Sequence, residues 1–290
     1  MIIKNIRSEE TNPGLQKFEL NLLELIQKVT NGSQVNVGKT GTKLIFKPGI
    51  VDCHDGLPVE HVTDLERSCT YYLELVSVLA IFGKSQLNLK LYGNTDDSID
   101  QGVESFARVM DSLLKHVGGS QFDLKVRKRG YAPLGGGEVT LQQGFCRKLE
   151  AVTMIDEGKI KRVRGWVTSA KVSPQLTTRV VDKIREVFND YIPDVWVHTD
   201  HYKKGQCGDQ AGYAVSLMAE TTTGVVLTKD FRFDERFKLP EELGQHCAYS
   251  MLDEIFTGGV VDSANQGLLL MLAGLSSGDN VSQVKLARVT

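Results

Sequence analysis

The feature that most constrains the fold of this chain is the alternation of amphipathic helical segments with short strand-like segments. Residues 15–30 place apolar side chains at helical spacing, and Asn31-Gly32 ends that pattern. The pattern then recurs about every 30 to 45 residues, which predicts repeated α/β units. Further helices are predicted at 65–82 and 98–117, and strands at 34–38, 42–47, 86–92, 122–128 and 137–142.

A second cycle of the same kind begins near residue 147. A long strand is predicted at 160–170, and the helix at 173–191 has Ser173 as its N-cap and Pro174 in its first turn. Mixed helices and strands throughout predict an α+β or α/β fold. The remaining predicted elements are strands at 193–198, 213–219, 224–229 and 282–286 and helices at 240–256 and 264–275.

Charge is distributed unevenly along this pattern. The 290 residues have a formal net charge of −2, but residues 125–171 contain eleven Lys or Arg and four acidic residues. That window, called the basic window below, therefore carries +7, and the rest of the chain sums to −9. Clustered cations are typical of a surface that binds nucleic acid or an acidic protein, so the near-neutral total does not exclude an RNA partner.

The cations in the basic window follow strand spacing, because alternate residues of a strand project from the same face. Solvated sheet faces, or Lys residues that protect an edge strand, are the alternative explanation. Lys125, Arg127 and Arg129 are expected on one face of a strand, and Lys159 and Lys161 on one face of another, with Arg162 and Arg164 opposite. We predict RNA or partner contact for eight residues: Lys125, Arg127, Lys128, Arg129, Lys159, Lys161, Arg162 and Arg164.

The segment KRGYAPLGGGEV, residues 128–139, lies between two predicted strands. Three consecutive glycines permit positive φ and close backbone approach, and amides beside the neighbouring cations could hold a phosphate. The alternative is a tight or bulged hairpin in which the glycines only turn the chain. The spacing does not match GxGxxG, and Gly38-Lys39-Thr40 lacks the first glycine and the following helix of a P-loop.

Other kinds of site are not indicated. His198, Asp200, His201 and Cys207 lack the paired short spacings of zinc ligands, so we predict no metal, no cofactor and no catalytic residue. Five scattered cysteines without a CxxC pair predict free thiols in a reducing compartment. No apolar run approaches the roughly 20 residues of a membrane span, and the first residues do not match a signal peptide. No membrane association is therefore predicted.

At the glycine-rich segment the sequence resembles the RNA 3′-terminal phosphate cyclase superfamily, and the matching glycine loop comprises Gly130, Tyr131, Gly135, Gly136, Gly137 and Glu138. Within that superfamily the chain is most similar to the eukaryotic branch that acts in ribosome biogenesis. Further segments match in the same order: IRSEETNPGL at 6–15, VTNGS at 29–33, TGTKLIFKPG at 40–49, RGWVTSAKVSPQ at 164–175, PDVWVHTDH at 193–201, MAETTTG at 218–224 and GGVVDSANQ at 258–266.

The resemblance implies a fold and a function. The fold would be a larger cyclase-like domain of repeated units, 1–146 and 236–290, interrupted by a smaller inserted α+β domain, 147–235. The function would be that of a non-catalytic assembly factor of the small-subunit processome, acting in pre-rRNA processing and 40S subunit biogenesis in the nucleus and nucleolus. Its implied partners are a nucleolar ribosome-assembly GTPase and other processome proteins, with pre-rRNA and small nucleolar RNA nearby.

Departures from the family pattern argue against cyclase chemistry. Cyclases adenylylate a histidine whose segment would lie beyond Thr290, and we expect the C-terminus to be truncated. An Asp-Gln pair of the cyclases aligns with Gly267-Leu268, and Glu19 stands where cyclases have another histidine. The alternatives that remain open are an endonuclease that cleaves pre-rRNA and an active ATP-dependent RNA 3′-phosphate cyclase.

Overall fold

The computed structural model describes residues 1–119, 121–276 and 280–288, and it confirms the predicted mixture of helices and strands. Thr290, the predicted truncation point, lies outside the described residues. The helices in the described residues are α1 Lys17–Val29, α2 Cys69–Ile81, α3 Val103–His116, α4 Pro174–Phe188, α5 Pro240–Thr257 and α6 Gln266–Gly274, with a 3₁₀ turn at Cys53–Gly56.

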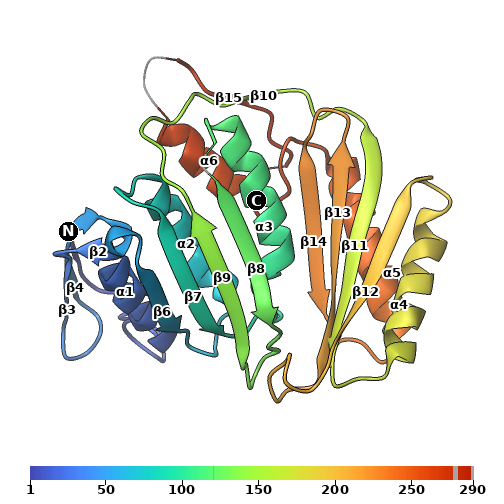
Figure 1. Ribbon diagram of the computed structural model, residues 1–290, viewed down its shortest axis with the longest axis horizontal. Coiled ribbons are helices and arrows are strands. Elements are labelled where there is room, and N and C mark those ends of the chain that lie inside the picture. Colours follow the sequence, from blue (N-terminus) through green and yellow to red (C-terminus); the bar gives the residue numbers. More distant parts are fainter. Residues whose placement is uncertain (120, 277–279, 289–290) are drawn as a thin grey trace.

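The strands form two four-stranded sheets and three smaller ones within the part of the chain that the structure describes. The first large sheet has the order β6-β7-β9-β8 and the second β12-β11-β13-β14 (Figure 1). The strands are β1 Ile2–Ile3, β2 Thr30–Asn31, β3 Gln34–Val37, β4 Leu44–Lys47, β5 Ile50–Val51, β6 Pro58–Val62, β7 Leu87–Gly93, β8 Phe122–Lys128, β9 Gly137–Gln143, β10 Thr153–Met154, β11 Ile160–Ala170, β12 Val195–Tyr202, β13 Gly212–Thr221, β14 Val226–Arg232 and β15 Gln283–Val284.

The first large sheet buries one face against α2 and α3. Leu87, Leu89 and Leu91 alternate along β7 and are almost fully buried, while the residues between them are partly exposed. This alternation is the period-2 pattern of a half-buried strand. Phe106 and Met110 of α3 lie at helical spacing and join the same core. The opposite face of this sheet is polar and reaches solvent.

The second large sheet packs against α4 and α5 (Figure 1). β11 and β12 are parallel, as a strand–helix–strand crossover through α4 requires, and β13 and β14 are antiparallel additions. The predicted cap of α4 is confirmed, because Ser173 Oγ accepts a hydrogen bond from Gln175 N at 3.4 Å. The sheet lies inside the predicted insert 147–235, and α5, beyond that segment, packs against it. The three domain ranges stay predictions.

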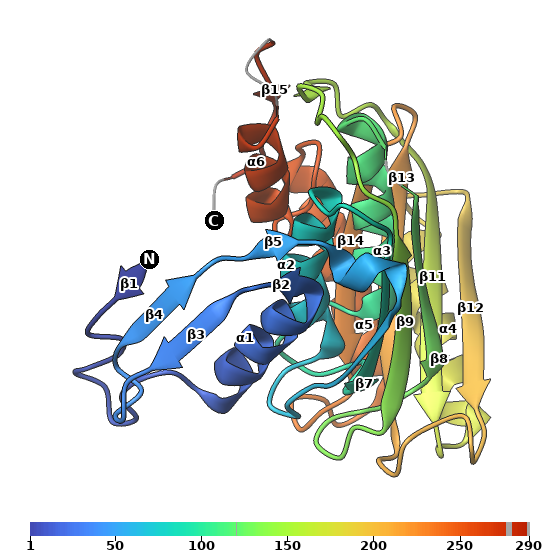
Figure 2. The ribbon, with the colours of Figure 1, turned by 60° about the vertical axis from the view of Figure 1, so that its left-hand side comes forward.

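Helix α3 connects the two sheets, since it contacts β8 on one side and β13 and β14 on the other (Figure 1). Polar contacts fix its first turn to β14. Ser105 Oγ donates to Asp230 Oδ1 at 2.6 Å, and Gln101 Nε2, just before the helix, donates to Thr228 Oγ1 at 2.7 Å. Beyond the β6 edge of the first sheet lie α1 and the small sheet β1-β4-β3 (Figures 1 and 2). No helix in the described residues combines the length and apolar character of a membrane span.

The sequence missed β6 and the short strands β2, β5 and β10. β6 begins at Pro58, a residue that argues against a strand interior, and one of its two inward positions is a histidine. The other three are two-residue strands, too short to show a period. Their pairing depends on the partner segment that the fold brings alongside.

His61 on β6 is only 3% exposed and is held between two polar side chains. Its Nε2–H donates to Asn21 Oδ1 at 3.0 Å, and its Nδ1 accepts from Lys28 Nζ, 3.2 Å away, because an ammonium group can only donate. Burial, followed by the positive charge of Lys28, lowers the pKa of His61 to about 4. The ring is therefore neutral in the folded protein at pH 7.

We predict that His61 contributes stability that is lost as the pH falls from about 6.5 to about 4. In that window the unfolded histidine binds a proton that the folded one does not, so the free energy of unfolding decreases with falling pH. Between pH 7 and pH 4, the free energy of unfolding measured with urea should fall by about 2 to 3 kcal/mol more in the wild type than in His61→Gln. The glutamine keeps a hydrogen-bond donor and an acceptor but does not titrate. Identical pH dependence of the two proteins would contradict the prediction.

Candidate functional site

The glycine-rich loop lies where the two large sheets meet. β8 ends at Lys128, and the chain then crosses toward the second sheet before β9 begins at Gly137. Arg129 N donates to Gln206 O at 3.0 Å, and Arg129 O accepts from Gly208 N at 2.7 Å. The loop is therefore hydrogen-bonded, through its backbone, to the segment that follows β12.

The glycines of this loop permit close packing. A Cβ on Gly130 would lie 2.3 Å from Gly137 N, so no other residue fits there. Gly136 has a φ of +77°, and a Cβ on it would lie 2.8 Å from the Cα of Gly208. These contacts favour the structural explanation of the glycine signature over a phosphate cradle, because the loop backbone is packed against protein.

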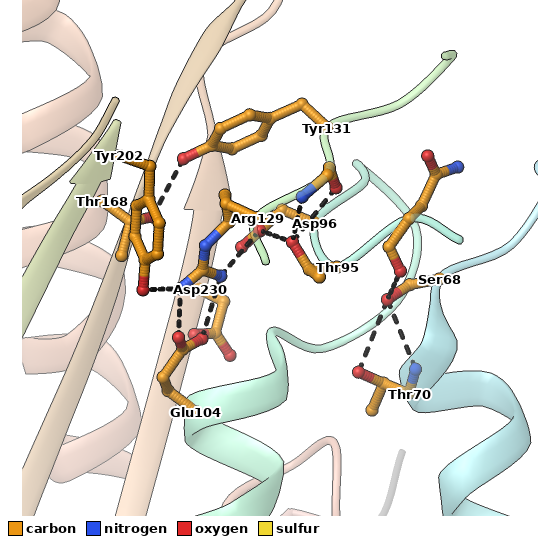
Figure 3. A network of polar contacts seen from close by, with 12 residues as sticks. Ser68, Thr70, Thr95, Asp96, Glu104, Arg129, Tyr131, Thr168, Tyr202 and Asp230 are labelled. Atoms are coloured by element: carbon orange, nitrogen blue, oxygen red, sulfur yellow. Dashed lines mark hydrogen bonds and ion pairs between the residues drawn. The ribbon is translucent and has the colours of Figure 1, made fainter. Parts of the chain in front are cut away.

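Arg129 is the centre of a buried polar network (Figure 3). Its guanidinium donates to Asp96 Oδ2 at 2.8 Å and forms an ion pair with the carboxylate of Glu104. Its Cζ atom lies 5.1 Å from the ring centroid of Tyr202, a cation–π distance. The side chain is fully enclosed, so this charge does not reach solvent.

The network keeps Arg129 charged. Burial opposes the positive charge, but the carboxylates of Asp96 and Glu104 outweigh it and raise the pKa of Arg129 well above its usual value. Thr95 Oγ1 donates to Asp96 Oδ2 at 2.6 Å and accepts from Gly130 N at 3.1 Å. The ion pair is thus linked by hydrogen bonds to the glycine loop itself.

Tyr131 inserts into the second sheet next to this network (Figure 3). Its ring is fully buried among Ala170, Cys207 and Ala214, and its hydroxyl lies 3.0 Å from Thr168 Oγ1. Burial, the largest effect, raises the pKa of the Tyr131 hydroxyl. Tyr131 therefore acts as an anchor between the two sheets.

The expectation that Arg129 lies in an exposed row with Lys125 and Arg127 is wrong. The register of β8 against β9 shifts between Val126 and Lys128, which is a bulge, and the strand ends directly after it. The alternation that strand spacing implies is broken there. Arg129 therefore turns inward to the two carboxylates, while the cations before it stay outside.

The other cations of β8 reach solvent. Lys125 pairs with Asp123 at 2.5 Å, and Arg127 Nε donates to Thr140 Oγ1 at 3.2 Å. Lys128 is partly exposed and is the register partner of Glu138. Glu138 in turn lies 3.4 Å from Lys90 Nζ, so the last residue of the glycine signature belongs to an ion-pair network on the polar face of the first sheet.

The cations of the second sheet also reach solvent. Lys159 precedes β11 and is exposed, as is Lys161. Arg162 pairs with Glu220 at 2.6 Å, and Arg164 makes two hydrogen bonds, of 2.9 and 3.0 Å, to the carboxylate of Asp194. Seven of the eight predicted contact residues thus have accessible side chains, and the structure brings them to the two sheets on either side of the buried network.

Sequence reasoning missed the partners of Arg129. Asp96 and Glu104 lie 33 and 25 residues before it, and Tyr202 lies 73 residues after it. In the sequence, Asp96 lies just before the predicted helix at 98–117, and nothing there indicates a contact with Arg129. Nothing in the sequence indicated Asp230 either. Burial raises the pKa of its carboxyl group to about 7, although hydrogen bonds from Ser105 and Ser216 act in the opposite direction.

The four residues weighed against the zinc-ligand pattern, His198, Asp200, His201 and Cys207, lie apart in the structure. His198 and Asp200 project from one face of β12, whereas His201 alternates to the other face, where its Nδ1 lies 2.6 Å from Ser169 Oγ. Cys207 is buried beside Tyr131. These four residues do not converge on one point, so their arrangement does not fit tetrahedral zinc coordination.

The chain is similar to one protein family over its whole length. The model of the RNA 3′-terminal phosphate cyclase family matches residues 1–290. RNA 3′-terminal phosphate cyclase-like proteins of Mus musculus and Homo sapiens are both 41% identical over 290 residues, covering 98% of this chain and 77% of theirs. The rRNA processing protein rcl1 of Schizosaccharomyces pombe is 34% identical over 280 residues, covering 96% of this chain and 76% of its own.

The burial of Arg129 gives a stability prediction. Arg129→Ala should lower the free energy of unfolding by about 3–5 kcal/mol, because it leaves two carboxylates without their cation. Arg127→Ala, a matched exposed arginine two residues earlier, should change it by less than about 0.5 kcal/mol. Urea denaturation followed by circular dichroism measures both. Similar small effects of the two substitutions would show that the network does not stabilise the fold.

Proposed function

This chain belongs to the RNA 3′-terminal phosphate cyclase family, and on that premise we propose that it acts in ribosomal RNA processing as a non-catalytic binding protein. Two observations support the proposal: the 41% identity to proteins named cyclase-like, and the 34% identity to a yeast protein named for rRNA processing. Work on ribosomal RNA precursors would place the chain in the nucleus and nucleolus.

In its finer form, the proposal is an assembly factor of the small-subunit processome that contributes to 40S subunit biogenesis. A nucleolar ribosome-assembly GTPase would be its direct partner, with pre-rRNA and small nucleolar RNA nearby. The charge distribution supports a position between RNA and protein, because the basic window carries +7 and the remainder of the chain −9. A negatively charged remainder suits a basic protein partner.

The surroundings of Glu19 support the absence of cyclase chemistry. The family resemblance puts a cyclase histidine at this position. Here Glu19 Oε2 accepts from Gln16 N at 2.8 Å, which caps α1, and its carboxylate pairs with Arg7 at 2.5 Å. The hydrogen bond from Arg7 is the largest of the effects that lower the pKa of Glu19. Its carboxylate therefore stabilises the start of a helix.

Gly267-Leu268, where the family resemblance puts an Asp-Gln pair of the cyclases, also supports the absence of cyclase chemistry. Both residues lie on α6, and the side chain of Leu268 is 2% exposed in the main core. An apolar core residue offers neither a donor nor an acceptor to a nucleotide. The position contributes packing instead of chemistry.

The observation that carries the binding proposal is the division of the basic window. Arg129 is used internally to join the sheets, while Lys125, Arg127 and Lys161 stay exposed. Lys125 and Arg127 lie on the edge strand β8 and Lys161 on β11, next to the edge strand β12, so all three are available to phosphates, and none is required by the buried network.

A charge-reversal variant tests this assignment. Lys125→Glu, Arg127→Glu and Lys161→Glu together should weaken binding of a labelled pre-rRNA fragment at least tenfold at 100 mM salt and make the salt dependence shallower. The same variant should fail to restore rRNA processing in cells depleted of the protein, as followed by the precursor pattern on a Northern blot. Circular dichroism should show that the variant is folded as the wild type is.

The matched control reverses three exposed lysines outside the basic window: Lys17→Glu, Lys43→Glu and Lys84→Glu. It imposes the same change in net charge, so it should retain RNA affinity within about twofold if position matters more than total charge. An equal loss of RNA affinity in both variants would show that binding depends only on the net charge of the protein. Normal processing in depleted cells would refute the proposed function.

Incubation with α-labelled ATP tests the non-catalytic assignment. We expect no covalent AMP on the full-length protein after denaturing gel electrophoresis, whereas an active cyclase run in parallel becomes labelled. A labelled adduct on the chain that disappears after one point substitution would contradict the proposal and restore the cyclase alternative.

A further inference from the structure

Both tryptophans of the chain lie on one face of the second large sheet, the face directed away from α4 and α5. Trp166 of β11 and Trp196 of β12 occupy diagonal positions on neighbouring strands, since Trp166 is paired with His198 and Arg164 with Trp196. Trp196 is 55% exposed, and Trp166 is partly exposed. Single exposed rings are common on protein surfaces, but two neighbouring aromatic rings on one sheet face form a contiguous patch of the kind that marks a binding site.

Neighbouring side chains orient these rings. Trp196 Nε1–H donates to His198 Nδ1 at 3.2 Å, and the two ring centroids are 5.7 Å apart. Arg108 of α3 places its guanidinium 5.6 Å from the ring centroid of Trp166. Each indole is thus held by one polar contact, while part of its surface stays open. We call this surface the tryptophan face: Trp166, Trp196, His198, Arg162 and Arg164.

Cations surround the two rings. Arg162 and Arg164 alternate with Trp166 along β11, and their carboxylate partners Glu220 and Asp194 are side chains at the surface. Because a phosphate offers an arginine the same bidentate acceptor geometry as a carboxylate, it can take the place of Asp194 or Glu220 at these guanidinium groups. Arg108 has no carboxylate partner among the residues that the structure describes.

The tryptophan face continues into a cavity of about 400 Å³ between α3, β8 and β11. Trp166, Arg108 and Lys125 line it, so the cavity connects the tryptophan face to the cations of β8. The acidic residues of the lining are already paired: Glu104 with Arg129, Asp111 with Lys115 and Asp123 with Lys125.

We propose that the tryptophan face binds single-stranded RNA, with unpaired bases stacked on Trp196 and Trp166 and phosphates held by the arginines. Aromatic rings interleaved with cations are the recurring arrangement of single-strand binding surfaces, because every base offers a stacking face and every nucleotide a negative charge. A duplex keeps its bases stacked inside the helix and cannot use the indoles. The inference rests on the proposed function and names the RNA class that it would use.

The experiment measures fluorescence anisotropy of a fluorescein-labelled 12-nucleotide oligouridylate. Trp196→Ala should weaken binding about 5- to 100-fold, the range expected for loss of one base–aromatic stack. The slope of affinity against salt should stay unchanged, because no phosphate contact is removed. Trp196→Phe, which keeps a ring, should recover most of the affinity. A blunt 12-base-pair RNA duplex should bind the wild type and Trp196→Ala equally.

Phe256→Ala is the matched control, because Phe256 is an aromatic residue on α5 that is 94% exposed. It should bind the oligonucleotide as the wild type does. Wild-type affinity of Trp196→Ala would overturn the proposal, as would a preference for duplex. Normal RNA binding by Trp196→Ala together with loss of a co-purifying protein would assign the tryptophan face to a protein partner instead.

Failure of this inference and failure of the proposed function are distinguishable. If depletion of the protein disturbs rRNA processing but Trp196→Ala binds the oligonucleotide normally, only the stacking surface is refuted. If Trp196→Ala weakens binding but depletion leaves processing intact, the single-strand site stands and the role in processing is refuted.

Discussion

The structure depends on the ion pairs of one buried arginine. Arg129 is fully enclosed, and a charge in that position is tolerated only because Asp96 and Glu104 lie within hydrogen-bond distance. The three residues come from the end of β8, from the loop before α3 and from α3 itself. Pairing this one charge therefore ties together the end of β8, the start of α3 and the loop between β7 and α3.

The glycine loop follows from the same constraint. Once Arg129 turns inward, the next residues must pass between two closely spaced sheets. Glycine is the only residue type that fits at position 130, beside Gly137. Tyr131 then enters the second sheet and closes a small apolar cluster. In this chain, the residues of the family's glycine signature pack one sheet against the other. This structural role is compatible with a family member that does not perform cyclase chemistry.

Burial of Arg129 also changes the meaning of the chain's charge. A net charge of −2 gives no indication of an RNA partner, and the +7 of the basic window overstates the exposed positive charge by including a buried one. The exposed cations lie on β8 and β11, and on β11 they alternate with an aromatic residue. Cations and aromatic surface are therefore found together. The cations attract an anionic partner at long range, and the aromatic ring supplies stacking contact at short range.

The sequence by itself determined the helices and the longer strands other than β6, the mixed α/β class and the family. Helical and strand periods are properties of consecutive residues, and Ser173-Pro174 sets the start of α4 through hydrogen bonds within one turn. The same spacing failed at Arg129, because a bulge and a strand end are decided by pairing with β9. Only the tertiary structure brought Asp96 and Glu104 to Arg129, and Trp196 onto the strand next to Trp166, since these pairs of residues lie 25 to 33 positions apart in the chain. Burial depends on such distant neighbours, which the spacing of consecutive residues does not reveal.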